Sequence, residues 1–542
     1  MKVAFVVFNK GTDTYGVRLL TSILRKEGHD VSLSFPFELG DYADELFQDV
    51  DEDKISQLTD VIDGSDIVLF SLLTSYYIKQ AYFYTKAIKE KLDIPVVWGG
   101  SHCIADPEGS FGQHDIVCPG EADICLPKFL KSYEKTKQIP TDIPGMWVRK
   151  GNKEFKTGMP EIYENLDEVP FPDCSYTDNF EWNSKAGQFI DMDVKDANLK
   201  KTFIYTTMTR GCVYKCTFCL HSTMNFGMKG IRRHSVDYMM REFEYLNEQF
   251  PNINTIGLAD SDLYLLPKRF LFDFIDQYKK RINKQFYFSV SPATWKDDVS
   301  EAFFTSGLVS SVWIGIQGAS DKMKQYYGRN MDKNDKIVHI SKKMREYYKK
   351  YRSESFYHMI WDSKVEEEED YIENVKLMNQ MRQPFELRNH SLSVLPGTTI
   401  FEAEVGHSER TFLKSGTEED ILKTVAFYTD QYSGGDAGTI RTELTSYYVS
   451  LSNICSLITI PKKILDYLFK NHKYKTVQKL EKILYGLNRK LGRLNKVIYL
   501  SLYRPRDLRR IIATRIRNKL AKRVKFGKNQ ILTTYPGPNR LP

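Results

Sequence analysis

The clearest candidates for chemistry are three cysteines in the middle of the chain. Cys212, Cys216 and Cys219 stand at C-x3-C-x2-C spacing, directly after an apolar, strand-like run. Three thiolates can bind three of the four irons of a 4Fe-4S cluster, which leaves the fourth iron open to a small chelating ligand. A structural zinc site is the alternative, with His221 as the fourth ligand, but zinc usually takes ligands in paired C-x2-C spacing. The spacing therefore favours an iron–sulfur centre.

The composition indicates a globular protein of two or three domains in a reducing compartment. The chain of 542 residues is too long for one hydrophobic core, and it is 42% apolar and 27% charged. Its eight cysteines are too few for a disulfide scaffold of this length. The chain opens on a strand-like segment instead of a signal peptide, and no apolar run reaches about 18 residues, the length that crosses a bilayer. We therefore expect a cytoplasmic protein.

The charge is distributed unevenly. Residues 461–542 contain 23 Lys and Arg but only three acidic residues, so this tail carries +20 and the rest of the chain −13. Such a tail indicates an anionic partner, and the lack of a recognisable RNA-binding module disfavours nucleic acid. Apolar residues between the basic ones favour peripheral contact with an anionic bilayer, or else packing of the apolar face on the protein's own body. These residues are Ile464, Leu465, Leu468, Phe469, Leu484, Leu487, Ile498 and Leu502.

The elements that must position these residues follow an α/β pattern. Residues 1–135 alternate apolar strands with helices, which predicts a doubly wound parallel sheet that binds ligands at the carboxyl ends of its strands. Residues 136–200 are rich in Pro, Asp and Lys and are predicted to be a connector, irregular at 169–175. Residues 201–405 contain six further strand–helix units, which predict an open, partial β/α barrel. Residues 406–542 are predicted to be helical and, from 461, basic.

Within 203–400 the chain resembles the radical S-adenosylmethionine (SAM) superfamily. Besides the cysteine motif, with Phe218 as its aromatic residue, the resemblance is carried by GIRRHSVDYMMREFEYL (230–246), ADSDLYL (259–265), GLVSSVWIGIQGAS (307–320) and VLPGTT (394–399). It implies that SAM binds the open iron and is cleaved reductively to a 5′-deoxyadenosyl radical. It also implies that Gln317 and Asp260 contact polar groups of SAM, although either could instead hydrogen-bond strand ends. Gln317 replaces the family's usual Glu, and the family's G-G-E segment is missing.

Residues 1–130 resemble the cobalamin-binding domain found before the radical SAM domain in the class B radical SAM methyltransferase-like subfamily. The carriers are GVRLLTSILRKEGHDV (16–31), DIVLFSLLTS (66–75), VVWGGSHCIADPE (96–108) and DIVCPGEAD (115–123). Gly99 and Gly100 at one strand end would let the backbone approach a ligand closely. Ser71 and Thr74 offer hydroxyl groups at a neighbouring strand end. The resemblance therefore implies a Rossmann-like domain with a cobalamin site at this edge.

One departure concerns the ligand below cobalt. Asp13 stands where methionine-synthase-type domains have the cobalt-binding His of D-x-H-x-x-G, so we expect no lower histidine. His102 is an alternative ligand, but its G-G-x-H context favours a structural role. A degenerate domain that no longer binds cobalamin is the other interpretation.

Together these resemblances imply a cobalamin-dependent radical SAM methyltransferase acting on an unactivated carbon of a small-molecule or lipid-like substrate. The reductant would be an external donor of the flavodoxin or ferredoxin type. Two alternatives stay open: a radical SAM cyclisation or rearrangement without methylation, and a tRNA- or nucleic-acid-modifying enzyme led by the basic tail.

Overall fold

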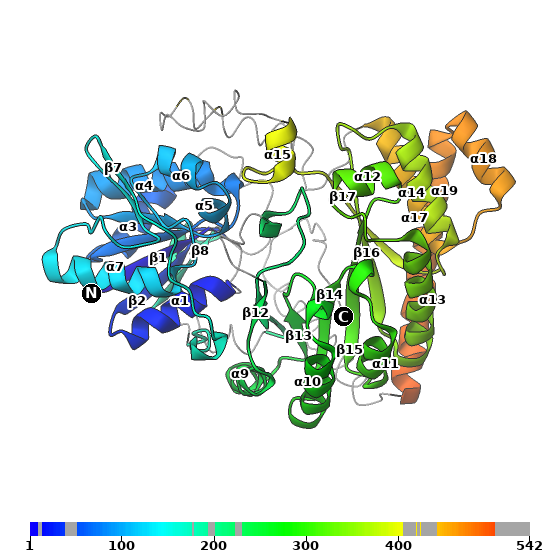
Figure 1. Cartoon of the computed structure of the whole chain (residues 1–542), viewed down its shortest axis with the longest axis horizontal. Coiled ribbons are helices and arrows are strands. Elements are labelled where there is room, and N and C mark those ends of the chain that lie inside the picture. Colours follow the sequence, from blue (N-terminus) through cyan, green and yellow to red (C-terminus); the bar gives the residue numbers. More distant parts are fainter. Residues whose placement is uncertain are drawn as a thin grey trace, which may run out of the picture.

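Figure 1 shows the fold in a computed structural model, which describes residues 1–8, 14–37, 51–175, 178–192, 201–222, 230–404, 419, 423 and 442–503, the side chains of 489–503 excepted. Asp13 and residues 504–542 of the basic tail therefore lie outside the described residues. The described chain builds two sheets of mainly parallel strands, followed by a group of helices (Figure 1).

The front sheet has the strand order β7-β6-β5-β4-β3-β1-β2-β8-β9. Its central run β2-β1-β3-β4-β5 is parallel, which is a doubly wound order with its switch point between β1 and β3. The predicted doubly wound sheet is thus confirmed. The strands are β1 (Lys2–Val7), β2 (Asp30–Phe35), β3 (Ile67–Ser71), β4 (Val96–Gly99), β5 (Ile116–Val117), β6 (Trp147–Lys150), β7 (Lys153–Lys156), β8 (Asn179–Asn183) and β9 (Gln188–Asp191).

Helices cover both faces of this sheet because its central strands are apolar on both sides. Along β1, Val3 and Val7 enter the core under α1 and α7, whereas Ala4 and Val6 enter a second core under α3 and α4. The helices are α1 (Tyr15–Lys26), α3 (Glu52–Val61), η1 (Ser75–Tyr77), α4 (Ile78–Leu92), α5 (Ser101–Ala105), α6 (Pro107–Gln113), α7 (Ala122–Thr136) and η2 (Leu166–Glu168).

The region predicted as a connector, residues 136–200, differs from that expectation. It supplies β6, β7, β8 and β9, which extend the front sheet at both edges. These strands are short, and they mix polar and charged side chains with apolar ones, as strands near a sheet edge commonly do. Their hairpin turns contain Gly151 and Gly187, both with positive φ. The stretch 169–175 has no regular structure, as expected.

The second sheet has six parallel strands in chain order, β10-β13-β14-β15-β16-β17, and it is open between β10 and β17. This is the predicted partial barrel. Its strands are β10 (Phe203–Thr206), β13 (Thr255–Leu258), β14 (Gln285–Val290), β15 (Val309–Gln317), β16 (Glu354–Trp361) and β17 (Glu386–Ser391). A separate antiparallel pair, β11 (Thr209–Arg210) and β12 (Arg232–Arg233), leads into and out of the segment that holds the cysteines.

Helices pack on one face of this second sheet. Alternate strand residues such as Ile256, Phe286 and Val312 are fully buried beneath them. The helical elements are η3 (Leu220–Ser222), α9 (Val236–Gln249), η4 (Leu263–Leu265), α10 (Lys268–Arg281), η5 (Pro292–Thr294), α11 (Asp297–Thr305), α12 (Asp321–Tyr326), α13 (Asn334–Tyr351), α14 (Glu368–Gln380) and α15 (Thr399–Glu404).

The C-terminal helices pack on the barrel at the end far from the front sheet (Figure 1). They are α17 (Glu443–Leu457), α18 (Lys462–Asn471) and α19 (Tyr474–Tyr503). Asn453 on α17 accepts from Asn389 of β17 at 2.9 Å, and Tyr448 donates to Glu368 of α14 at 2.5 Å. The described part of this region is therefore helical, as predicted. None of the described helices is long and apolar enough to cross a membrane.

Candidate functional site

The three cysteines lie in the loop that follows β11, at the carboxyl end of β10. Cys212 and Cys216 are buried and Cys219 is partly exposed, and all three are free thiols. The amide of Cys219 donates to the carbonyl of Cys216 at 3.1 Å, which closes a tight turn. Burial raises the pKa of the Cys212 thiol. The loop therefore gathers reduced, sheltered sulfur donors of the soft type that iron–sulfur clusters use.

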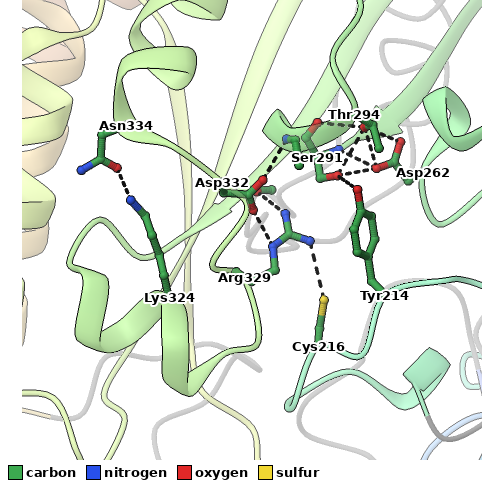
Figure 2. Close-up of polar contacts among 11 residues, drawn as sticks. Tyr214, Cys216, Asp262, Ser291, Thr294, Lys324, Arg329, Asp332 and Asn334 are labelled. Atoms are coloured by element: carbon green, nitrogen blue, oxygen red, sulfur yellow. Dashed lines mark hydrogen bonds and ion pairs between the residues drawn. The ribbon is translucent and has the colours of Figure 1, made fainter.

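Arg329 connects this loop to the end of β15. Its Nη1 lies 3.6 Å from the Sγ of Cys216, its Nη2 donates to the carbonyl of Gly315 at 2.9 Å, and its Nε donates to Asp332 at 2.6 Å (Figure 2). Burial opposes the charge, yet Asp332 and the Cys216 thiol raise the pKa of Arg329. The guanidinium therefore places a fixed positive charge beside the Cys216 sulfur. Sequence reasoning missed Arg329, because an arginine after a helix has no distinguishing spacing.

A second polar network lies beside the first. The buried carboxylate of Asp262 accepts from the hydroxyl of Ser291 at 2.5 Å and from that of Thr294 at 2.8 Å. Ser291 also contacts the hydroxyl of Tyr214, inside the cysteine loop, at 3.3 Å (Figure 2). Burial raises the pKa of Asp262, while these hydrogen bonds oppose that rise. The network ties the loop to the carboxyl ends of β13 and β14.

The residues predicted to contact SAM lie around the same loop. Asp260 accepts from the amide of Met208 at 3.0 Å and from the hydroxyl of Thr209 at 2.6 Å, so its described contacts are those of a residue that holds a strand end. Gln317 ends β15 with a φ of 68°, a conformation that is strained for any residue other than glycine. Its side-chain nitrogen lies over Gly315. Phe218 packs edge-on against Tyr327, with ring centroids 5.5 Å apart.

Ion pairs join the cysteine loop to the front sheet. Arg210, at the start of the loop, donates to Glu121 at 2.7 Å and to Asp123 at 2.9 Å. Arg232, on β12, donates to the same Glu121 carboxylate and to the carbonyl of Tyr163. Glu121 and Asp123 follow β5, so they belong to the carboxyl edge of the front sheet. We call these four charged side chains the clamp. The segments that contain these residues were recognised in the sequence, but the ion pairs between them could not be predicted from it.

The remaining predicted residues of the front domain lie at that same edge. Ser71 ends β3 and pairs with Gly99 at the end of β4. Gly100 has a φ of 101°, and a Cβ there would lie 2.7 Å from the carbonyl oxygen of Leu72. Thr74 is half-buried just before η1. Ser71, Thr74 and the two glycines are therefore brought together, whereas Asp13 is outside the described residues.

His102 is built into the structure beneath this edge. Its Nδ1 lies 3.0 Å from the hydroxyl of Ser75, its side chain is 2% exposed, and burial lowers its pKa to about 4. These contacts are those of the structural role that the sequence favoured.

Aromatic side chains line the face of the second sheet opposite its helices. Gly257 makes room for them, because a Cβ there would lie 2.7 Å from the hydroxyl of Tyr287. Neighbouring rings in the row have centroids 5.1–5.5 Å apart: Phe203, Tyr287, Trp313, His358 and His390. The two histidines are also hydrogen-bonded, with Nδ1 of His358 3.0 Å from Nε2 of His390. This aromatic row offers an apolar wall with two imidazoles at one end, and burial lowers the pKa of both.

A family comparison identifies the domain that contains the cysteine loop. Residues 206–378 match the model of the Radical SAM superfamily, and this range includes all three cysteines and the strands β11 to β16. The chain contains a radical SAM domain. The superfamily implies a 4Fe-4S cluster and SAM as the cofactors of this domain.

Whole-chain comparisons extend beyond the radical SAM domain. The chain is 22% identical over 360 residues to a protein of Methanocaldococcus jannaschii named "Putative methylthiotransferase MJ0865", covering 63% of this chain and 68% of that protein. The fold of this chain is similar to that of TsrM, a radical SAM methyltransferase from Kitasatospora setae. The structure of TsrM with tryptophan and a SAM analogue gives a TM-score of 0.56 at 14% identity, covering 74% and 75% of the two chains. The TsrM structure with cobalamin and a [4Fe-4S] cluster gives 0.55, also at 14% identity.

The residues present in the radical SAM domain fit an iron–sulfur cluster. Its donor set is three thiols on one loop, one of them beside a guanidinium. Within the described ranges no group of three or more His, Cys, Asp or Glu side chains is arranged to hold a single metal ion. A cluster differs from a single ion in distributing its cysteines over separate irons.

Proposed function

We propose that this radical SAM enzyme is a cobalamin-dependent methyltransferase that methylates a carbon atom, with the cluster on Cys212, Cys216 and Cys219. The observation that carries the proposal is the clamp, because it joins the ligand-binding edge of a doubly wound domain to the arms of the cysteine loop. A cofactor bound at that edge would lie close to the radical chemistry. The front fold, similar to that of TsrM, supports the same conclusion.

The chain's own residues would each do a limited task. When bound, the cluster supplies the electron that cleaves SAM, and cobalamin supplies the methyl group. Arg329 would place its positive charge beside Cys216, and Gln317 would offer its amide to SAM at the end of β15. The aromatic row would bind the substrate through apolar contact and exclude water from it. Ser71, Thr74 and the paired glycines would border the cobalamin, with no histidine below cobalt.

The cluster assignment is tested by replacing all three cysteines with Ala. The anaerobically reconstituted wild type, with dithionite as reductant, should cleave SAM to 5′-deoxyadenosine and show iron–sulfur absorbance. The triple variant should lose both. Cys174→Ala, a buried cysteine outside the loop, is the matched control and should keep both activities. Retained SAM cleavage in the triple variant would sink the assignment.

The cobalamin assignment is tested by anaerobic reconstitution with hydroxocobalamin, followed by gel filtration and an absorbance spectrum. The wild type should retain cobalamin in a form without a histidine below cobalt. Gly100→Val should weaken retention strongly, because a side chain there collides with the Leu72 backbone. His102→Gln should keep the same cobalamin spectrum. A folded wild type that retains no cobalamin would support the degenerate domain, and with it a cyclisation or rearrangement without methylation.

A second candidate, methylthiolation, is favoured by the name of the Methanocaldococcus jannaschii relative. Against it, the described C-terminal region is helical, whereas methylthiolating enzymes that act on tRNA resemble one another in carrying a compact β domain there. Product mass separates the candidates: methylation adds one CH2 unit, and methylthiolation also adds sulfur.

A further inference from the structure

Two C-terminal helices expose large apolar side chains to solvent. On α18, Ile464 is 50% and Tyr467 is 54% exposed. On α19, Leu480, Ile483 and Leu487 are 39%, 50% and 52% exposed. We call these five residues the exposed strip. The three on α19 are spaced three and four residues apart, so they share one side of the helix.

The exposed strip is separate from the face with which these helices pack on the barrel. Leu465 and Val477 are buried, and Leu468 and Leu484 are partly buried against the core. A helix with one packed face normally carries polar residues on the other face. Packing on the protein's own body therefore accounts for only part of the apolar pattern that the sequence shows.

The strip is surrounded by positive charge. Seven lysines on and between the two helices are exposed, and none pairs with a carboxylate of the described residues: Lys462, Lys463, Lys470, Lys473, Lys475, Lys479 and Lys482. Only Asp466 and Glu481 are acidic between 462 and 488, and Glu481 accepts from Asn453 at 2.6 Å. Further basic residues follow along the chain from Arg489.

We propose that the exposed strip and its lysines dock the enzyme on the surface of an anionic phospholipid bilayer. Apolar side chains enter the boundary between headgroups and acyl chains, while the long lysine side chains reach anionic headgroups. A nucleic acid would satisfy the lysines but leave Ile464, Tyr467 and the α19 residues in water. The helices α18 and α19 lie at the end of the molecule away from the front sheet (Figure 1), so docking through them does not involve that sheet. This inference is independent of the reaction proposed above.

The test uses the full chain and co-sedimentation with vesicles of phosphatidylglycerol and phosphatidylcholine. The wild type should sediment with them, and only weakly with pure phosphatidylcholine. The variant L480Q/I483Q/L487Q should lose binding at least tenfold, because Gln keeps the helix but removes the apolar contact. The matched control M159Q/F272Q changes two exposed apolar residues elsewhere and should bind like wild type. The variant K475Q/K479Q/K482Q should bind less and with a weaker dependence on salt.

Four results would overturn the proposal. The first is a wild type that stays in the supernatant, and the second is an L480Q/I483Q/L487Q variant that sediments like wild type. The third is a single-stranded RNA that displaces the wild type and L480Q/I483Q/L487Q from vesicles equally well. The fourth is a wild-type dimer, seen by light scattering, that is absent in L480Q/I483Q/L487Q, since the exposed strip would then bind a second copy of the chain. Circular dichroism of each variant checks that the helices remain folded.

Discussion

At the scale of single residues, Arg329 joins the cysteine loop to β15 through Cys216 and Gly315. It is buried with Asp332, whose own side chain is fully buried, and burial raises the pKa of that carboxyl. Removing the arginine would leave an unpaired buried carboxylate, a change that typically costs about 3–5 kcal/mol. It would also remove the positive charge beside Cys216, a proposed cluster ligand, and without that charge the cluster would accept an electron less readily.

We therefore expect Arg329→Met to destabilise the protein and to make the cluster harder to reduce. The double variant R329M/D332N removes the buried charge as well, so it should recover most of the stability but not the reduction potential. Denaturant unfolding measures the first effect, and a redox titration followed by electron paramagnetic resonance measures the second. An unchanged potential in the double variant would mean that Arg329 only supports folding.

Glu242, on α9, makes the stability depend on pH. It is fully buried, it accepts from the hydroxyl of Thr206 at 2.6 Å, and burial raises its pKa to about 7. A carboxyl whose pKa is raised on folding contributes stability that is fully present below its unfolded pKa and is lost as pH rises through the folded value. Stability should therefore fall between pH 5 and 8.

The variant E242Q should remove most of that fall. It should unfold like wild type near pH 5 and be more stable near pH 8, by on the order of 2–3 kcal/mol. Glu248→Gln, an exposed position on the same helix, is the control and should keep the wild-type pH dependence. The result is read from urea unfolding at several pH values, and parallel curves for wild type and E242Q would contradict it.

At the scale of elements, the clamp determines how the front sheet meets the cysteine loop. Asp123 and Arg210 have side chains 9% and 17% exposed, so the pair is only weakly screened by solvent. Truncating one partner of such a pair typically costs about 2–5 kcal/mol. Because Glu121 contacts both Arg210 and Arg232, it holds the two arms of the loop together.

We expect Asp123→Asn to destabilise the protein by a few kcal/mol. We expect Glu121→Gln to uncouple SAM cleavage from formation of the methylated product. The E121Q enzyme should still cleave SAM but form less methylated product for each 5′-deoxyadenosine, because the front domain no longer holds its place. Asp237→Asn, at an exposed i,i+4 pair with Arg241, should change stability by less than about 0.5 kcal/mol. Equal product ratios in E121Q and wild type would limit the clamp to a structural role.

At the scale of the whole molecule, the front sheet and the barrel also meet at Gly397, in the P-G-T turn. A Cβ at Gly397 would lie 1.9 Å from the carbonyl oxygen of Ala105 on α5, and its φ is 79°. Gly307 has a similar φ of 72° but nothing within 4 Å of the same position. The two glycines therefore separate backbone strain from contact between the domains.

Gly307→Ala should cost about 1–2 kcal/mol, which is the price of the left-handed conformation alone. Gly397→Ala should cost clearly more, because α5 must also move away from the turn. Urea unfolding measures both, and limited proteolysis should cut G397A faster than G307A between the domains. Equal losses in the two variants would mean that the turn adapts without disturbing the interface.

The sequence by itself determined the cysteine spacing, the two parallel α/β units implied by alternating elements, and the resemblance that the family comparison confirms in the radical SAM domain. These are local signals: apolar runs buried on both faces, such as 3–7, mark parallel strands wherever they occur. The strands β6 to β9, at the two ends of the front sheet, were not predicted because they are short and contain polar or charged residues between the apolar ones. Pairings between distant residues, such as Arg210 with Glu121 or Arg329 with Cys216, leave no trace in local periodicity.

Only the tertiary structure decided which side of each element faces what. In the structure Asp260 accepts a hydrogen bond from Met208, just before the cysteine loop, and His102 is buried beneath the front edge. Five rings from separate strands form one aromatic row. On α18 and α19 it separated the apolar residues into a packed set and an exposed strip, a division that 3.6-residue periodicity alone could not make. The physical reason is that burial depends on neighbours from the rest of the chain, which the spacing within one helix does not specify.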